Sequence, residues 1–261
     1  MQAGGQEFDS PRLHQFEFFA SVNFHRGVFI CANEVKQPMG KQSIEEIQAG
    51  LAEWEFLKKL PAEIDGFKLS AGTGLAGQIL NIASYVNEPM HCRLDLTYTT
   101  ETFDYVPVKT IGLHTFRDER FFCRDKDKFA RLMEERLPEI IGDVDRKHPH
   151  LLSHEAREMG FDQWEYWRTL PEKIGGFERF LTPDNPVNYI NGSMIFLDYT
   201  DFASGNQIYF SYNGFRNEIF AEMKRHRLPL TTGRFDAKSL DELSLLLDKY
   251  LDNSLKELEK C

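Results

Sequence analysis

The feature that most constrains this chain is an internal repeat with an offset of 110 residues. Ten residues within positions 43–67 recur, without a gap, within positions 153–177. The pairs are Ser43/Ser153, Glu45/Glu155, Gly50/Gly160, Trp54/Trp164, Glu55/Glu165, Leu60/Leu170, Pro61/Pro171, Ile64/Ile174, Gly66/Gly176 and Phe67/Phe177. Average residue frequencies would give roughly one or two identities over such a stretch. The repeat therefore predicts one small fold used twice, in units spanning 39–147 and 148–261.

A second similarity lies further along the chain, at a different offset. Residues 116–121 read Phe-Arg-Asp-Glu-Arg-Phe, and residues 215–220 read Phe-Arg-Asn-Glu-Ile-Phe, which is an offset of 99. If the two segments are equivalent, the first unit contains about 11 additional residues, the difference between the two offsets. The natural position for this insertion is the stretch 69–79.

Hydrophobic spacing predicts that each unit contains a helix, several strands and a closing helix. Apolar residues recur every three or four positions across 45–60, which is typical of an amphipathic helix, and Pro61 is expected to end it. Closing helices are expected over 126–141 and after Ser239, which forms a capping box with Glu242. Strands are expected at 91–98, 105–113, 193–199, 207–212 and 215–223, although the last segment could instead open a helix.

These elements predict an α+β fold, a tandem duplication of a helix–antiparallel meander–helix unit. Asn213-Gly214 is a strong hairpin signal because both residues tolerate a positive φ. The polar segment 143–149 marks the boundary between the units. In each unit we expect helices on one face of the sheet, and whether the two sheets join is left open.

Residues 1–38 are predicted not to belong to the native fold. Residues 6–15 can be back-translated into a DNA string with a short stem, a loop and a terminal CCA, which resembles the 3′ end of a bacterial tRNA gene. We expect this segment to be tRNA read-through and spacer, or disordered chain, with translation starting at Met39; an ordinary polar leader is the alternative. Because integrative elements commonly enter chromosomes at tRNA genes, the gene resembles the cargo of a mobile genetic island.

Composition favours an acidic cytoplasmic protein. Lys plus Arg total 31 and Asp plus Glu total 41, so the formal net charge is −10, and nucleic acid is an unlikely partner. The four cysteines form no C-x-x-C pair, so no metal site is predicted. The chain also shows no apolar stretch long enough to span a membrane and no signal peptide.

Two motifs suggest a ligand site, although their surroundings favour plain loops. Gly72, Gly74 and Gly77 spell G-x-G-x-x-G before a possible helix over 78–85, as in dinucleotide-binding loops. The strand expected before them is too short and polar for that fold, so a flexible glycine-rich loop is favoured and no cofactor is predicted. His148, His150 and His154 lie near the boundary between the units, where a solvated linker is favoured over a metal site.

Arg117 and Glu119, with Arg216 and Glu218, are the predicted partner-binding residues. Their repetition suggests a paired binding surface on strands, and a cross-strand ion pair is the alternative. The basic cluster formed by residues 224–227 with Arg234 is expected to be a solvated loop. Trp54 and Trp164 are expected in the core.

These observations favour a non-enzymatic protein that recognises a protein partner, as an immunity or defence protein would. Acidic charge suits capture of a basic partner because complementary fields speed encounter. The alternative is an enzyme or ligand-binding protein for a small polar or nucleotide substrate, with its site between the repeats or at the loop 72–77. No catalytic residue is predicted, and the oligomeric state is left open.

Overall fold

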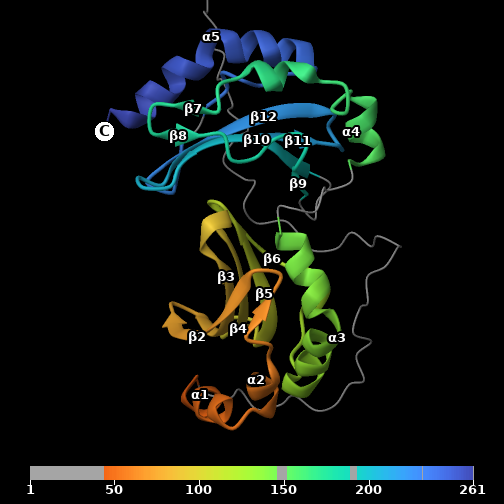
Figure 1. Cartoon of the computed structure of the whole chain (residues 1–261), viewed down its shortest axis with the longest axis vertical. Coiled ribbons are helices and arrows are strands. Elements are labelled where there is room, and N and C mark those ends of the chain that lie inside the picture. The colour runs from red at the N-terminus through yellow and green to blue at the C-terminus, as the bar shows by residue number, and fades with distance from the viewer. Residues whose placement is uncertain (1–43, 146–151, 189–192, 231, 261) are drawn as a thin grey trace, which may run out of the picture. The chain divides into compact units, whose positions relative to one another are not determined.

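The structure of the chain, a computed structural model, describes residues 44–145, 152–188, 193–230 and 232–260 (Figure 1). All of them belong to one compact unit, Lys36–Cys261. We refer to 44–145 as the first half and to 152–260 as the second half. The interpretation of residues 1–38, the start at Met39, the capping residue Ser43 and the histidines His148 and His150 lie outside the described residues.

The first half contains two short helices, an antiparallel sheet and a long closing helix. The sheet has six strands, which follow one another in chain order. The elements are α1 (Ile44–Ala52), α2 (Glu55–Lys59), β1 (Glu63–Ile64), β2 (Phe67–Ala76), β3 (Ile79–Asn87), η1 (Glu88–Met90), β4 (Cys92–Thr99), β5 (Asp104–Ile111), β6 (His114–Arg117), η2 (Glu119–Phe121) and α3 (Lys126–Val144).

The second half has the same succession of helices, antiparallel sheet and closing helix. Its strand order is β13-β12-β11-β10-β8-β7, and β9 pairs separately with β10. The elements are α4 (His154–Glu158), η3 (Glu165–Thr169), β7 (Lys173–Ile174), β8 (Phe177–Glu178), β9 (Val187–Asn188), β10 (Ser193–Asp201), β11 (Asn206–Asn213), β12 (Glu218–Arg225), β13 (Leu228–Leu230) and α5 (Leu240–Glu259). In the described part of the chain the two sheets are separate, and the mixed α+β prediction is confirmed.

Each sheet buries one face under its closing helix (Figure 1). Both helices present apolar side chains every three or four residues, which is the stripe that a helix needs to cover a sheet. In α5 this stripe is Leu243, Leu247, Leu251, Leu255 and Leu258. Its N-cap, Ser239, accepts a hydrogen bond from the backbone N–H of Glu242 at 3.1 Å, as the capping-box prediction requires.

From β3 onwards, strand positions recur between the halves with a constant offset of 114 residues. β3, β4 and β5 have the same lengths as β10, β11 and β12, and each begins 114 residues before its counterpart. The last part of the two halves follows the same offset. It includes the isolated bridges Tyr105–Cys123 and Ile219–Ala237, the N-caps Asp125 and Ser239, and the ion pairs Arg120–Asp143 and Arg234–Glu257.

The predicted equivalence of 116–121 with 215–220 is therefore wrong. Phe116 and Arg117 end β6, whereas Phe215 and Arg216 lie in the turn before β12. The offset rises from 110 at the first helices to 114 at β3, so the second half carries four more residues there. Within the described residues, the first half has no 11-residue insertion relative to the second. Most of the stretch 69–79, where the insertion was expected, belongs to strand β2.

The predicted helix over 45–60 is interrupted. Trp54 separates α1 from α2 with an extended backbone (φ −76°, ψ 103°), which buries its ring against Phe56 and Tyr105. Burying the indole outweighs continuing the helix by one turn. The second half repeats this break at Trp164, and both tryptophans are in the core as predicted.

The halves differ most at strand β2 and at the segments that correspond to it in the second half. In the first half β2 is one strand of ten residues with a bulge between Ala71 and Gly74. In the second half, β8 and β9 take its place along β10, and residues 179–186 loop out between them. The four additional residues of the second half therefore form a loop at this edge.

Candidate binding site

The glycine motif lies in a hairpin and not in a loop before a helix. Gly72 and Gly74 are part of β2, Gly77 lies in the turn, and the expected helix over 78–85 is strand β3. A Cβ on Gly72 would lie 2.2 Å from the carbonyl oxygen of Asn81, so only glycine fits there. Gly74 and Gly77 have positive φ values of 89° and 59°. The motif thus serves strand geometry: in the described part of the chain it is followed by strand β3, and not by a helix whose N-terminus could hold a phosphate.

The four predicted partner-binding residues occupy unlike positions. Arg117 ends β6 and Glu119 opens η2, so they do not alternate along one strand. Arg216 is exposed in a turn, and Glu218 is the first residue of β12. In the described part of the chain, no ion pair joins Arg117 to Glu119 or Arg216 to Glu218. The structure therefore does not bring them together as a repeated surface.

The basic cluster is partly engaged within the second half. Arg234 forms an ion pair of 2.8 Å with Glu257, and Arg225 donates to the backbone carbonyl oxygen of that residue. Lys224 stacks on the ring of Tyr209 at 4.9 Å, and burial lowers the pKa of its ammonium group. His154, the described member of the histidine group, is exposed on α4.

A buried polar network connects the halves, where the alternative hypothesis placed a site. His114 of β6 lies within 3.3 Å of the carboxylate of Asp198, and Gln207 lies 2.9 Å from the same imidazole nitrogen. Asp198 also accepts hydrogen bonds from the backbone N–H groups of Phe180 and Leu181. His114 and Asp198 have no exposed side-chain surface, so these groups form a packed contact.

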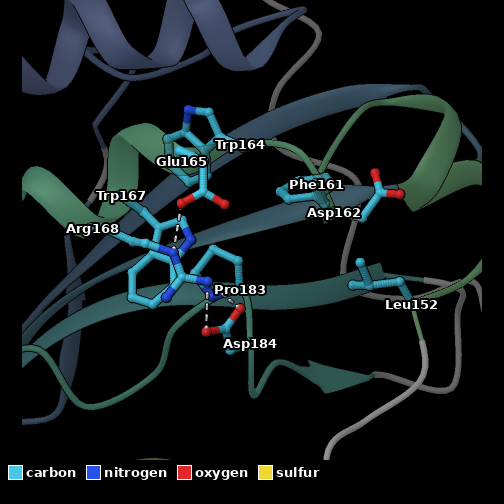
Figure 2. Close-up of a pocket in the computed structure, with 9 residues that line it drawn as sticks. All are labelled: Leu152, Phe161, Asp162, Trp164, Glu165, Trp167, Arg168, Pro183 and Asp184. Carbon is cyan, nitrogen blue, oxygen red and sulfur yellow. Dashed lines mark hydrogen bonds and ion pairs between the residues drawn. The ribbon is translucent and has the colours of Figure 1, made fainter.

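One pocket lies in the second half, between η3 and the loop 179–186 (Figure 2). It has a volume of about 240 Å³. Its apolar lining comes from Leu152, Phe161, Trp164, Trp167 and Pro183, and its charged lining from Asp162, Glu165, Arg168 and Asp184. Three carboxylates and one guanidinium give the lining a formal charge of −2. We call this the 161–184 pocket.

Arg168 bridges the two sides of the 161–184 pocket (Figure 2). Its Nε donates to Glu165 at 2.7 Å, and its Nη2 lies 3.1 Å from an oxygen of Asp184. Its guanidinium carbon also lies 4.4 Å from the centre of the Trp167 ring. One cation thus contacts two carboxylates and an aromatic face, which is the environment that a guanidinium prefers.

Hydrogen bonds and a cation–π contact hold the aromatic lining of the pocket in place. Trp164 donates its indole N–H to Ser244 of α5 at 3.0 Å. Arg179 donates to the backbone carbonyl oxygens of Trp167 and Leu170, both at 2.7 Å, and its guanidinium lies 5.2 Å from the Trp167 ring. These contacts fix the rings before any ligand arrives, which lowers the entropic cost of binding.

A smaller pocket of about 190 Å³ lies in the first half and is mainly apolar. Phe56, Leu60, Met133 and Leu137 contribute to its lining, with Lys59 and Glu134 at 4.0 Å from each other as its charged residues. It offers fewer polar groups that could orient a ligand, so the 161–184 pocket is the better candidate.

The sequence contains two signals for this pocket that were not used in the sequence-based prediction. At the 110-residue offset Trp167 faces Leu57, so the second half carries an additional aromatic residue there. Comparison of the halves would also have located the four additional residues before β10, had the later segments been aligned at the correct offset. Both features lie in the pocket or in the loop beside it.

No protein-family model, no curated protein and no solved structure matches this chain. Among the described residues, no group of three or more His, Cys, Asp or Glu side chains is arranged to hold a metal ion. No helix in the same part of the chain is both long and apolar enough to cross a membrane. Cys92 and Cys123 are buried, and their thiols donate to the backbone carbonyl oxygens of Met90 and Asp125.

Proposed function

We propose that this chain is a non-enzymatic binding protein that recognises a basic protein partner through the 161–184 pocket. The observation that carries the proposal is the combination of Asp162, Glu165 and Asp184 with a rigid aromatic lining. Carboxylates attract a basic side chain, and an indole face adds a cation–π contact. These groups replace Arg117, Glu119, Arg216 and Glu218 as our preferred partner-binding residues.

The proposal includes a tandem duplication of the helix–meander–helix unit. The ten identities at offset 110 and the equal strand lengths at offset 114 support it. A shared hydrogen bond also supports it. Tyr85 donates to the carbonyl oxygen of Pro61 at 2.8 Å, and Tyr199 donates to that of Pro171 at 2.6 Å. Two copies of one fold free one copy to diverge, and the pocket lies where the copies differ.

The biological setting in this proposal is a cytoplasmic immunity or defence protein carried on a mobile genetic island. It rests on the acidic charge of −10 and on the resemblance of residues 6–15 to a translated tRNA gene end. An immunity protein must find its partner quickly, and opposite charge raises association rates, most strongly at low salt. The expected partner is therefore a basic protein encoded beside this gene.

The test is calorimetric binding of the full chain to the purified product of the adjacent gene. Glu165→Gln with Asp184→Asn removes two charges from the pocket, and we expect affinity to fall by at least about tenfold. Glu55→Gln is the matched control, because Glu55 pairs with Lys58 as Glu165 pairs with Arg168. The control should change affinity less than about twofold.

Two results would contradict the proposal. If the double variant binds as tightly as the parent chain, the pocket is not the recognition surface. If the adjacent gene product does not bind at all, the immunity role is wrong.

A further inference from the structure

We propose that the 161–184 pocket selects a guanidinium group, and that Arg168 occupies this place in the free protein as an internal competitor. The inference rests on the proposed function, because it specifies which basic side chain the pocket accepts. It also assigns a role to Arg168: although Arg168 lines the pocket, it lowers the affinity of the pocket for its partner.

The contacts of Arg168 show what the pocket recognises. Glu165 accepts from Nε and Asp184 from Nη2, which are nitrogens on different arms of the planar guanidinium. A lysine ammonium is a compact point charge and cannot present donors along two directions while its plane stacks on an indole. The stacking distance of 4.4 Å to Trp167 completes a site for a flat cation.

Arg168 is able to leave this site at small cost. Its side chain is 50% exposed, and the side chains of Glu165 and Asp184 are 71% and 58% exposed. Ion pairs with this exposure contribute little to stability, since solvent screens them and their side chains lose entropy. Arg179, in contrast, is tied to two backbone carbonyls and serves the lining.

The first half shows the equivalent ion pair without the guanidinium, the aromatic ring or the second carboxylate. Lys58 contacts Glu55 at 2.5 Å, as Arg168 contacts Glu165, but Leu57 stands where Trp167 does. The loop that supplies Asp184 belongs to the second half, and β2 runs unbroken in the first. The change from Lys to Arg therefore accompanies the added aromatic ring and the added carboxylate, as expected if all three serve one guanidinium site.

The experiment measures binding of fluorescein-labelled hexaarginine and hexalysine peptides to the full chain by fluorescence anisotropy. Removing the competitor with Arg168→Gln should tighten hexaarginine binding about two- to tenfold, the range expected for losing two exposed ion pairs. Hexalysine binding should tighten by no more than about 1.5-fold, because an ammonium does not fill the place of a guanidinium. Lys58→Gln removes the same unit of charge from the equivalent place, so it should change neither affinity by more than about 1.5-fold.

The outcomes separate this inference from the proposed function. If the parent chain and Arg168→Gln bind neither peptide, the pocket does not take cations and the proposed function fails with it. If both peptides bind and Arg168→Gln weakens or leaves unchanged the binding of hexaarginine, Arg168 is not a competitor and only this inference fails. Equal tightening of both peptides would refute the selection of guanidinium. Circular dichroism checks that Arg168→Gln is folded, and Arg168→Lys, which keeps the charge, replaces it if it is not.

Discussion

Replacing Lys109 tests whether a buried charge network holds the first half together. Lys109 lies on β5 with 4% of its surface exposed, and its ammonium lies 2.7 Å from Asp118 and 2.8 Å from Asp143 of α3. Arg120 contacts the same two carboxylates at 2.7 and 2.6 Å. The network thus connects the sheet to the closing helix.

In the second half, uncharged residues occupy the two inner positions of this network. At the 114-residue offset Met223 stands for Lys109 and Thr232 for Asp118, while the outer ion pair persists as Arg234 with Glu257. Lys109→Met alone should leave the buried Asp118 short of one partner. Breaking a buried pair from one side costs about 3–5 kcal/mol, and the lower end applies because Arg120 still donates two hydrogen bonds to Asp118.

Urea unfolding at pH 7 measures the loss. With a slope of about 3 kcal/mol per molar urea, a cost of about 3 kcal/mol lowers the midpoint by about 1 M. The double variant Lys109→Met with Asp118→Thr copies the second half, and it should recover to within about 1 kcal/mol of the parent chain. The reasoning is refuted if the unfolding free energy of the single variant lies within about 0.5 kcal/mol of the parent value, which is about the usual error of such measurements. It is also refuted if the loss in the double variant equals the sum of the losses from the two single substitutions.

The pH dependence gives an independent check on the same network. Burial by itself raises the pKa of Asp118, but hydrogen bonds and charge from Arg120 and Lys109 outweigh it and lower the pKa below its ordinary 3.8. A lowered native pKa means that the unfolded chain binds more protons, so stability rises with pH. This contribution is complete above about pH 5 and is lost as the pH falls through and below 3.8. The double variant should lose less stability over that range.

Four further substitutions test the fold. Tyr85→Phe and Tyr199→Phe should each lower the unfolding free energy by about 1 kcal/mol in urea titrations, since each loses a hydrogen bond to a proline carbonyl, and unequal losses would weaken the duplication proposal. Gly72→Ala should cost roughly 1–3 kcal/mol because its Cβ would overlap backbone of β3, so an unchanged melting temperature would contradict the tight hairpin. Ser239→Ala should cost about 1 kcal/mol through loss of the α5 N-cap, measured by thermal melting, whereas no loss would show that the cap is redundant.

Local signals predicted the strands and helix ends well because they depend on neighbouring residues. The strand expected at 193–199 is β10, and the helix expected over 126–141 is α3. The hairpin at Asn213-Gly214 also forms, although the positive φ falls on Asn217 and Asn213 instead accepts hydrogen bonds from the next turn residues. Turn position depends on the register of β11 against β12, which a dipeptide does not specify.

Predictions that needed long-range information failed. β2 contains Ser70, Ala71, Ala76 and two glycines, and this composition is typical of a loop because glycine weakens a strand in isolation. Pairing with β3 over most of its length overrides that preference. The match between 116–121 and 215–220 failed for a related reason: six similar residues in a turn region carry less information about register than strand lengths do, and only the structure supplies those lengths.

The comparison of the two halves separates what the fold requires from what it does not. Both halves keep the buried Trp54 and Trp164 and the tyrosine–proline hydrogen bond, so these features belong to the shared architecture. The 161–184 pocket depends instead on Trp167, Asp184 and the loop 179–186, and the first half folds without any counterpart of them. These residues distinguish the second half from the first, and they converge on the pocket or on the loop beside it. The repeated pattern of Arg117, Glu119, Arg216 and Glu218 did not predict their positions, because the structure puts them in unlike elements, and their role in partner binding stays a prediction.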